Sequence, residues 1–138
     1  MVLPNAPEAR PYNQAAKQRF DDAQFLLNGQ RNTAAIYLAG YCVECIMKAL
    51  ILSTLPKTKR LAMVASFRGG KAHDFDWLRS QYAENGGPRL PTAINTAFSF
   101  VNTWAVDIRY MARTAKHSDA ARFVKSAKQI MKWADERM

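Results

Sequence analysis

The stretch that decides the fold is TAAIYLAGYCVECIMKALILS, from Thr33 to Ser53. If this stretch is a helix, apolar side chains cover nearly its whole circumference, which is typical of a helix buried at the centre of a bundle. Its length would also cross a membrane. However, Glu44 and Lys48 lie in its middle, and the sequence offers no second span. We therefore interpret it as a core helix, without a membrane partner.

Four polar residues interrupt this helix at intervals of four, three and four: Tyr37, Tyr41, Glu44 and Lys48. These intervals place their side chains along one side of the helix. Glu44 precedes Lys48 by four residues, the favourable order for an ion pair within a helix. A polar stripe on a core helix predicts that this side faces a groove or a partner subunit.

Helical periodicity continues on both sides of the central stretch. A helix is predicted from about Tyr12 to Asn28, ended by Gly29 in the left-handed conformation. Asn32 or Thr33 is the predicted cap of the central helix. Beyond Pro56 we expect a partly helical or mobile connection and then a short helix over about 74–83.

Two further helices complete the prediction. One begins at Pro91 and the last is capped by Ser118 or Asp119. Their predicted inward residues are Ile94, Ala97, Phe98, Val101 and Trp104 in the first, and Phe123, Ala127, Ile130, Met131 and Ala134 in the second. No segment has the pattern of a strand. The expected fold is all-α, an antiparallel bundle of four to five helices in a single domain over 1–138, with residues 1–10 flexible.

The chain carries a formal charge of +9 over 138 residues, which predicts a polyanionic partner or substrate. The charge alone leaves nucleic acid, nucleotide and acidic protein open. The basic residues form two blocks, Lys57, Lys59, Arg60, Arg68 and Lys71, and then Arg109, Arg113, Lys116, Arg122, Lys125, Lys128 and Lys132.

The two cysteines, Cys42 and Cys45, lie inside the apolar central stretch. Zinc would need two further ligands, and redox motifs usually open a helix after a strand. We interpret both as core thiols and expect neither a metal site nor a cofactor. The N-terminal residues lack the apolar segment of a secretory signal, which predicts a cytoplasmic protein.

Three phrases of the sequence resemble the HEPN domains (higher eukaryotes and prokaryotes nucleotide-binding). They are AAIYLAGYCVECIMKALI at Ala34–Ile51, KAHDFDWL at Lys71–Leu78, and the Trp104…Arg109-Tyr110 segment. The resemblance implies a helical bundle that is usually dimeric. Many such proteins are encoded beside a minimal nucleotidyltransferase and act with it as a toxin–antitoxin pair. Others are metal-independent RNases, and others only bind nucleotides or RNA.

The stretch DIRYMARTAKH, Asp107 to His117, holds the residues that this resemblance makes catalytic candidates. The family's RNases use an arginine and a histidine with four to six residues between them. Histidine would move the proton of the ribose 2′-OH and arginine would hold the phosphate, roles that suit their chemistry. Here Arg113 and His117 have three residues between them, and Arg109 and His117 have seven. Neither spacing fits, and whether 107–117 is helix or loop stays open.

The candidate residues for binding a nucleotide or RNA are Arg109, Tyr110, Arg113, Lys116, Tyr37 and Tyr41. A carboxylate on an apolar helix needs a partner, so we predict a structural ion pair between Glu44 and Arg109. His73 is expected to help cap a helix.

Three functions follow from these patterns. The first is a noncatalytic HEPN protein that binds RNA or a nucleotide as a homodimer and acts with a nucleotidyltransferase partner in a toxin–antitoxin-like module. The alternative is a metal-independent endoribonuclease toxin that uses His117 with Arg113 or Arg109. The imperfect spacing favours the first. A helical scaffold whose charge serves only solubility is the third.

Overall fold

A computed structural model of the chain describes residues 3–105 and 115–138. In these residues it contains α-helices and short 3-10 helices and no strand, which confirms the all-α class. The elements follow one another as η1 (Pro7–Ala9), α1 (Arg10–Asn28), α2 (Asn32–Thr54), α3 (Lys57–Ser66), η2 (Gly70–His73), α4 (Phe75–Glu84), α5 (Thr92–Ala105) and α6 (His117–Asp135). Six α-helices in the described ranges exceed the predicted four to five, because the connection after Pro56 contains α3.

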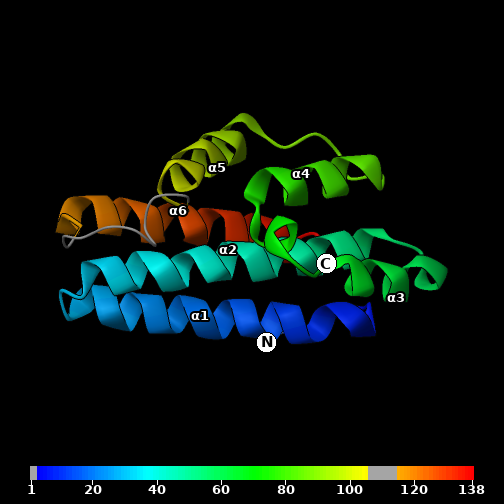
Figure 1. The fold of residues 1–138 in the computed structure, drawn as a ribbon, viewed down its shortest axis with the longest axis horizontal. Helices are drawn as coiled ribbons and strands as arrows, with labels where there is room; N and C mark the ends of the chain where they lie inside the picture. The colour runs from blue at the N-terminus through cyan, green and yellow to red at the C-terminus, as the bar shows by residue number, and fades with distance from the viewer. Residues whose placement is uncertain (1–2, 106–114) are drawn as a thin grey trace.

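Helix α2 is the core of the bundle, as the apolar stretch predicts. It runs alongside α1 over nearly its whole length and also packs on α6 and α4 (Figure 1). An 18-residue window of α2 is apolar enough to cross a membrane, but 72% of that window is buried within the protein itself. The neighbouring helices therefore cover most of the apolar surface of α2.

The inward faces of the last two helices agree with the sequence pattern. Ile94, Ala97, Phe98 and Val101 of α5 are buried. In α6 Phe123, Ala127, Ile130 and Ala134 are buried, while Met131 is partly exposed. Both helices lie on the same side of α2 (Figure 1). Periodicity therefore predicted which side chains meet the core.

Ala6 and Ala9 pack against the bundle, whereas the sequence predicts a flexible segment over 1–10. Ala6 and Ala9 are buried in a small cluster with Ala49 and Leu52 of α2. Small side chains let the 3-10 turn η1 approach α2 closely. The alanines gave no periodic signal that would have revealed this contact.

The turn between α1 and α2 differs from the prediction in one residue. Gly29 has a φ of −87° and remains close to helical, while Gln30 takes the left-handed conformation with a φ of 62°. The Gly29 N–H donates to the carbonyl of Phe25, and the Arg31 N–H donates to that of Leu26. Because the helical hydrogen bonds continue through Gly29, the reversal falls on the next residue.

Replacing Gln30 with glycine is expected to raise the free energy of unfolding by about 1 kcal/mol. A side chain disfavours the left-handed conformation, whereas glycine adopts it freely. Gln30 is exposed, so few contacts are lost. Chemical denaturation of both proteins measures the difference. A variant less stable than the parent would contradict the strain at Gln30.

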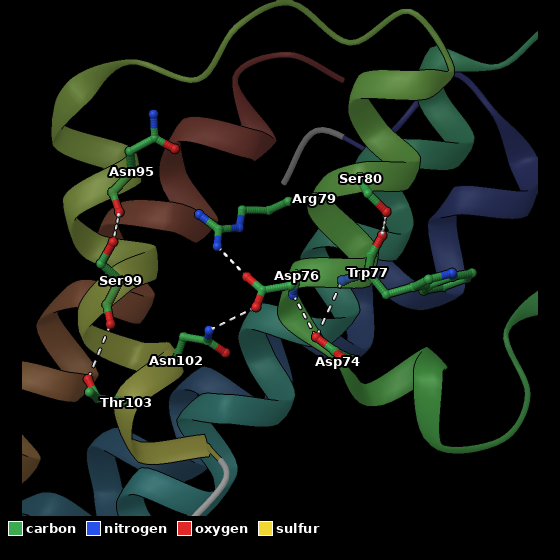
Figure 2. A network of polar contacts seen from close by, with 9 residues as sticks. All are labelled: Asp74, Asp76, Trp77, Arg79, Ser80, Asn95, Ser99, Asn102 and Thr103. Carbon is green, nitrogen blue, oxygen red and sulfur yellow. Dashed lines mark hydrogen bonds and ion pairs between the residues drawn. The ribbon is translucent and has the colours of Figure 1, made fainter.

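Helices α4 and α5 are joined by polar contacts (Figure 2). Asp74 caps α4 by accepting hydrogen bonds from the backbone N–H groups of Asp76 and Trp77. The Asp76 carboxylate forms an ion pair with Arg79 and accepts a hydrogen bond of 3.3 Å from Asn102 of α5. Arg79 also lies over the Phe98 ring, 5.2 Å from its centroid. These side-chain contacts link α4 to α5, while α4 packs mainly on α2 and α5 mainly on α6.

Candidate nucleic-acid interface

The start of α6 is bound to the start of α2 by three hydrogen bonds. The Asn32 side-chain amide donates to the carbonyl oxygen of Ala115 at 3.1 Å. The backbone N–H of Ala115 donates to the Thr33 hydroxyl oxygen at 2.9 Å. The Asn32 amide oxygen lies 3.0 Å from Nδ1 of His117. We call these three bonds the α2–α6 clamp.

Helices α2 and α6, which the clamp joins, begin at other residues than the sequence predicts. Asn32 is the first residue of α2 rather than its cap, and Arg31 occupies the cap position. Likewise α6 begins at His117 with Lys116 at the cap position, before the predicted Ser118 or Asp119. The side chains of Asn32 and Thr33 bond residues 83 and 82 positions away instead of their own helix. Tertiary contacts outcompeted local capping at this site.

His117 is exposed at the first position of α6, and the clamp sets the orientation of its ring. Because Asn32 donates through its nitrogen to Ala115, its oxygen faces His117 and accepts the hydrogen on Nδ1. A neutral ring held in this way presents Nε2 as an acceptor, and a protonated ring presents it as a donor. The arrangement suits either contact with a phosphate or transfer of a proton.

Only some of the other candidates in the Asp107–His117 stretch lie within the described residues. Arg109, Tyr110 and Arg113 lie outside them, as does the predicted ion pair of Arg109 with Glu44. Lys116 is described and exposed beside His117. The structure therefore places Lys116 and His117 at the start of α6, and the constellation with the arginines stays a prediction.

The described partners of Glu44 are Lys48 and His73. The carboxylate is 2.8 Å from Lys48 Nζ through one oxygen and 2.8 Å from His73 Nδ1 through the other. Glu44 and Lys48 are buried, with 8% and 5% of their surfaces exposed. The predicted pair within the helix is present, and η2 supplies a second partner to the same carboxylate.

The predicted capping role of His73 is wrong. Asp74 caps α4, while His73 points to Glu44, 29 residues earlier in the chain. Two neighbouring residues of the KAHD segment thus have different roles, because the histidine contacts the core helix and the aspartate caps α4.

Tyr37 and Tyr41 lie together on the outer side of α2. Their hydroxyl oxygens are 3.4 Å apart, and the rings meet edge to face at 5.2 Å. Beside them is an open recess of about 330 Å³ between α1 and α2, lined by Arg19, Asp22, Leu38, Tyr41 and Cys45. The recess combines an aromatic ring and apolar atoms with an ion pair, because the Arg19 guanidinium lies 3.3 Å from the Asp22 carboxylate. Its described lining therefore offers an apolar surface and no unpaired cation for a phosphate.

A second open recess of about 400 Å³ lies between α4, the following loop and α5. Asp76, Arg79 and Arg89 are among its lining residues. The hydrogen bond from Arg79 lowers the pKa of the Asp76 carboxyl, so this group is charged at neutral pH. Since that carboxylate already pairs with Arg79, Arg89 is the cation left exposed at the rim.

Neither cysteine has the environment of a reactive thiol. Burial raises the pKa of Cys45 to about 11, and burial raises that of Cys42 further. Both thiols are therefore protonated at neutral pH and poor nucleophiles. Among the described residues no group of three or more His, Cys, Asp or Glu side chains could hold a metal ion.

The described residues thus define a basic helical bundle with an oriented histidine and exposed cations at one helix start. The family model of the HEPN domain matches residues 10–137 of this chain. The chain therefore belongs to the HEPN family, whose members are associated with nucleotides or RNA. Comparisons with curated proteins and with solved structures gave no match.

Proposed function

We propose that this HEPN protein binds RNA or a nucleotide without cleaving it, as a cytoplasmic homodimer. We further propose that it acts with a minimal nucleotidyltransferase in a module of the toxin–antitoxin kind. The observation that carries the binding role is the group of exposed cations at and after the start of α6. The exposed ones are Lys116, Arg122, Lys125, Lys128 and Lys132.

The charge on α6 is poorly compensated within the described residues. No salt bridge of these five cations is found there, although Arg122 lies over Phe100 and Lys128 lies over Phe20. Helix α6 carries Asp119 in its first turn and Asp135 at its end, and Asp135 pairs with Lys17 of α1. A helix with uncompensated positive charge attracts polyanions, and phosphates are its simplest partners.

Support for the homodimer comes from the outer side of α2. Tyr37 is 39% exposed on the core helix, and Leu38 and Cys45 of the same helix are partly exposed. Burying this side against a second copy would remove apolar surface from water. Light scattering at micromolar concentration is expected to give the mass of two chains. A monomer at that concentration would contradict the dimer.

The nucleotidyltransferase partner rests on the family alone. The reading frames adjacent to the gene supply the test. If one encodes a small nucleotidyltransferase, the two proteins produced together are expected to co-purify. Separation of the two on a sizing column would count against a stable complex.

RNA binding is expected to weaken steeply as the salt concentration rises, because each neutralised phosphate releases counterions. Arg113→Ala should weaken binding and flatten the dependence of log K on log salt by about one contact. His117→Ala should leave binding nearly intact, since the proposed phosphate contacts are made by the arginine and lysine side chains. Fluorescence anisotropy with a labelled oligonucleotide at several salt concentrations measures both. An unchanged slope for Arg113→Ala would remove that residue from the interface.

The alternative, a metal-independent endoribonuclease, is favoured by the orientation that Asn32 gives to the His117 ring. It has a direct test, since the purified protein can be incubated with RNA and a metal chelator. Our proposal expects intact RNA. Cleavage that disappears in His117→Ala would replace it with the nuclease.

A further inference from the structure

We propose that this protein has a second RNA-binding surface, distant from α6 in the sequence, which contacts the phosphate backbone. It consists of Lys57 and Lys59, which project from different sides of α3 because they are two residues apart, of Arg68 after α3, and of Lys71 of η2. We call this run of exposed cations the α3–η2 basic face. The inference rests on the proposed RNA-binding function and adds to it a second place of contact.

The charge of this face is not cancelled by carboxylates near it in the sequence. No Asp or Glu occurs between Glu44 and Asp74. Glu44 is buried and engaged with Lys48 and His73, and Asp74 accepts the hydrogen bonds that cap α4. Both acids that flank this stretch are therefore already engaged.

One acid from elsewhere reaches α3, and it binds a different cation. Glu8 of η1 lies 3.5 Å from Arg60. Lys57, Lys59 and Arg68 have no salt bridge within the described residues, and all three are exposed. Lys71, also exposed, lies over the Trp77 ring at 5.5 Å, which leaves its charge at the surface. Four cations of this segment therefore remain uncompensated.

The stability of α3 gives no reason for these charges. Lys57 and Lys59 are in the first turn of α3, which has no acidic residue and no side-chain cap. Positive charge is unfavourable at this end of a helix because the helix dipole is positive there. None of the residues of α3 is buried, so packing does not require the lysines either. A role in binding explains these positive charges, which the stability of α3 does not.

The face is nevertheless held in place at its far end. His73 joins η2 to the core helix through Glu44. Phe67, between α3 and η2, meets Tyr12 and Trp77 edge to face at 5.6 and 6.3 Å. Arg68 and Lys71 are therefore attached to a fixed part of the bundle, which lowers the entropy lost when they bind a ligand.

The ligand chemistry follows from the aromatic residues of this region. Phe67 and Trp77 are only partly exposed, and they contact each other, Tyr12, Lys48 and Lys71. Stacking of bases requires an open ring face, whereas phosphates require only the exposed cations. The surface is suited to the phosphodiester backbone, without preference for a base sequence.

The test compares two variants that lose the same charge at different places. The first is Lys57→Gln/Lys59→Gln/Arg68→Gln, which neutralises the face. The control is Arg10→Gln/Arg31→Gln/Arg89→Gln, which removes three exposed cations from α1, the α1–α2 turn and the α4–α5 loop, outside both proposed surfaces. The probe is a labelled 20-nucleotide oligo(U), titrated by anisotropy at several salt concentrations. Circular dichroism checks that each variant is folded.

The face variant is expected to lower the slope of log K against log salt by about 2, from three lost single-strand contacts, and the control by about 1 or less. Oligo(dT) of the same length should show the same losses, because the backbone is what is contacted. Equal slopes for the face variant and the parent would overturn the face and leave RNA binding at α6 standing. A parent that does not bind oligo(U) at all would overturn the proposed function together with this surface.

A single substitution adds an independent measure. Lys57→Glu places an acid in the first turn of α3, where the helix dipole favours it. The melting temperature is expected to stay level or rise while affinity for oligo(U) falls. Affinity that stays level in a folded Lys57→Glu variant would also refute the face.

Discussion

Replacing Glu44 with alanine is expected to lower the free energy of unfolding by about 3–5 kcal/mol. The substitution leaves the Lys48 ammonium buried beside an empty space, with the Phe67 ring at 5.3 Å as its remaining described contact. It also removes the group that holds His73 and η2 to α2. A buried charge without its counter-charge is among the most destabilising changes in a protein interior.

The reference for this measurement is Glu84→Ala, which removes an exposed carboxylate from α4 and should change stability by less than about 0.5 kcal/mol. The double variant Glu44→Leu/Lys48→Leu removes both charges and should lose much less than Glu44→Ala alone. Urea denaturation of the parent, Glu44→Leu, Lys48→Leu and the double variant gives the coupling energy of the pair. Additive losses in the double variant would mean that Glu44 and Lys48 do not stabilise each other.

The predicted pair of Glu44 with Arg109 can be examined in the same way. A double-mutant cycle of Glu44→Ala with Arg109→Ala separates this arginine from Lys48 and His73. Coupling between the two would add Arg109 to the described partners. Without coupling, Lys48 and His73 remain the partners of Glu44.

The sequence predicted the features that depend on where apolar side chains fall. The composition of Thr33–Ser53 predicted the core helix, and the spacing of Ile94, Ala97, Phe98 and Val101 predicted the buried side of α5. Each apolar residue on one side of a helix adds to the buried surface, so the local spacing of these residues indicates which side faces the core. The ion pair of Glu44 and Lys48 was predictable for the same reason, since both residues lie on one helix.

The features that the sequence did not predict depend on partners far along the chain. His73 stands directly before a helix, where a cap is the usual role, yet it bonds Glu44. Asn32 and Thr33 are residue types that favour caps, but Ala115 and His117 compete for their side chains. A polar side chain can satisfy its hydrogen bonds in several ways. Only the packed bundle decides which one is realised.

The double variant Asn32→Ala/Thr33→Val is expected to lower the free energy of unfolding by roughly 2–4 kcal/mol, because both backbone groups of buried Ala115 lose their partners. Valine keeps the shape of threonine, so the loss reports the hydrogen bond more than packing. Gln24→Ala, which removes an exposed hydrogen bond to Asn28, should change stability by less than about 0.5 kcal/mol.

The clamp also sets the position of Lys116 and the ring of His117. If α6 binds RNA as proposed, the double variant should bind oligo(U) more weakly even at a temperature where it remains folded. A stability equal to that of Gln24→Ala would show that the clamp does not fix the start of α6, and the orientation of His117 would then need another cause.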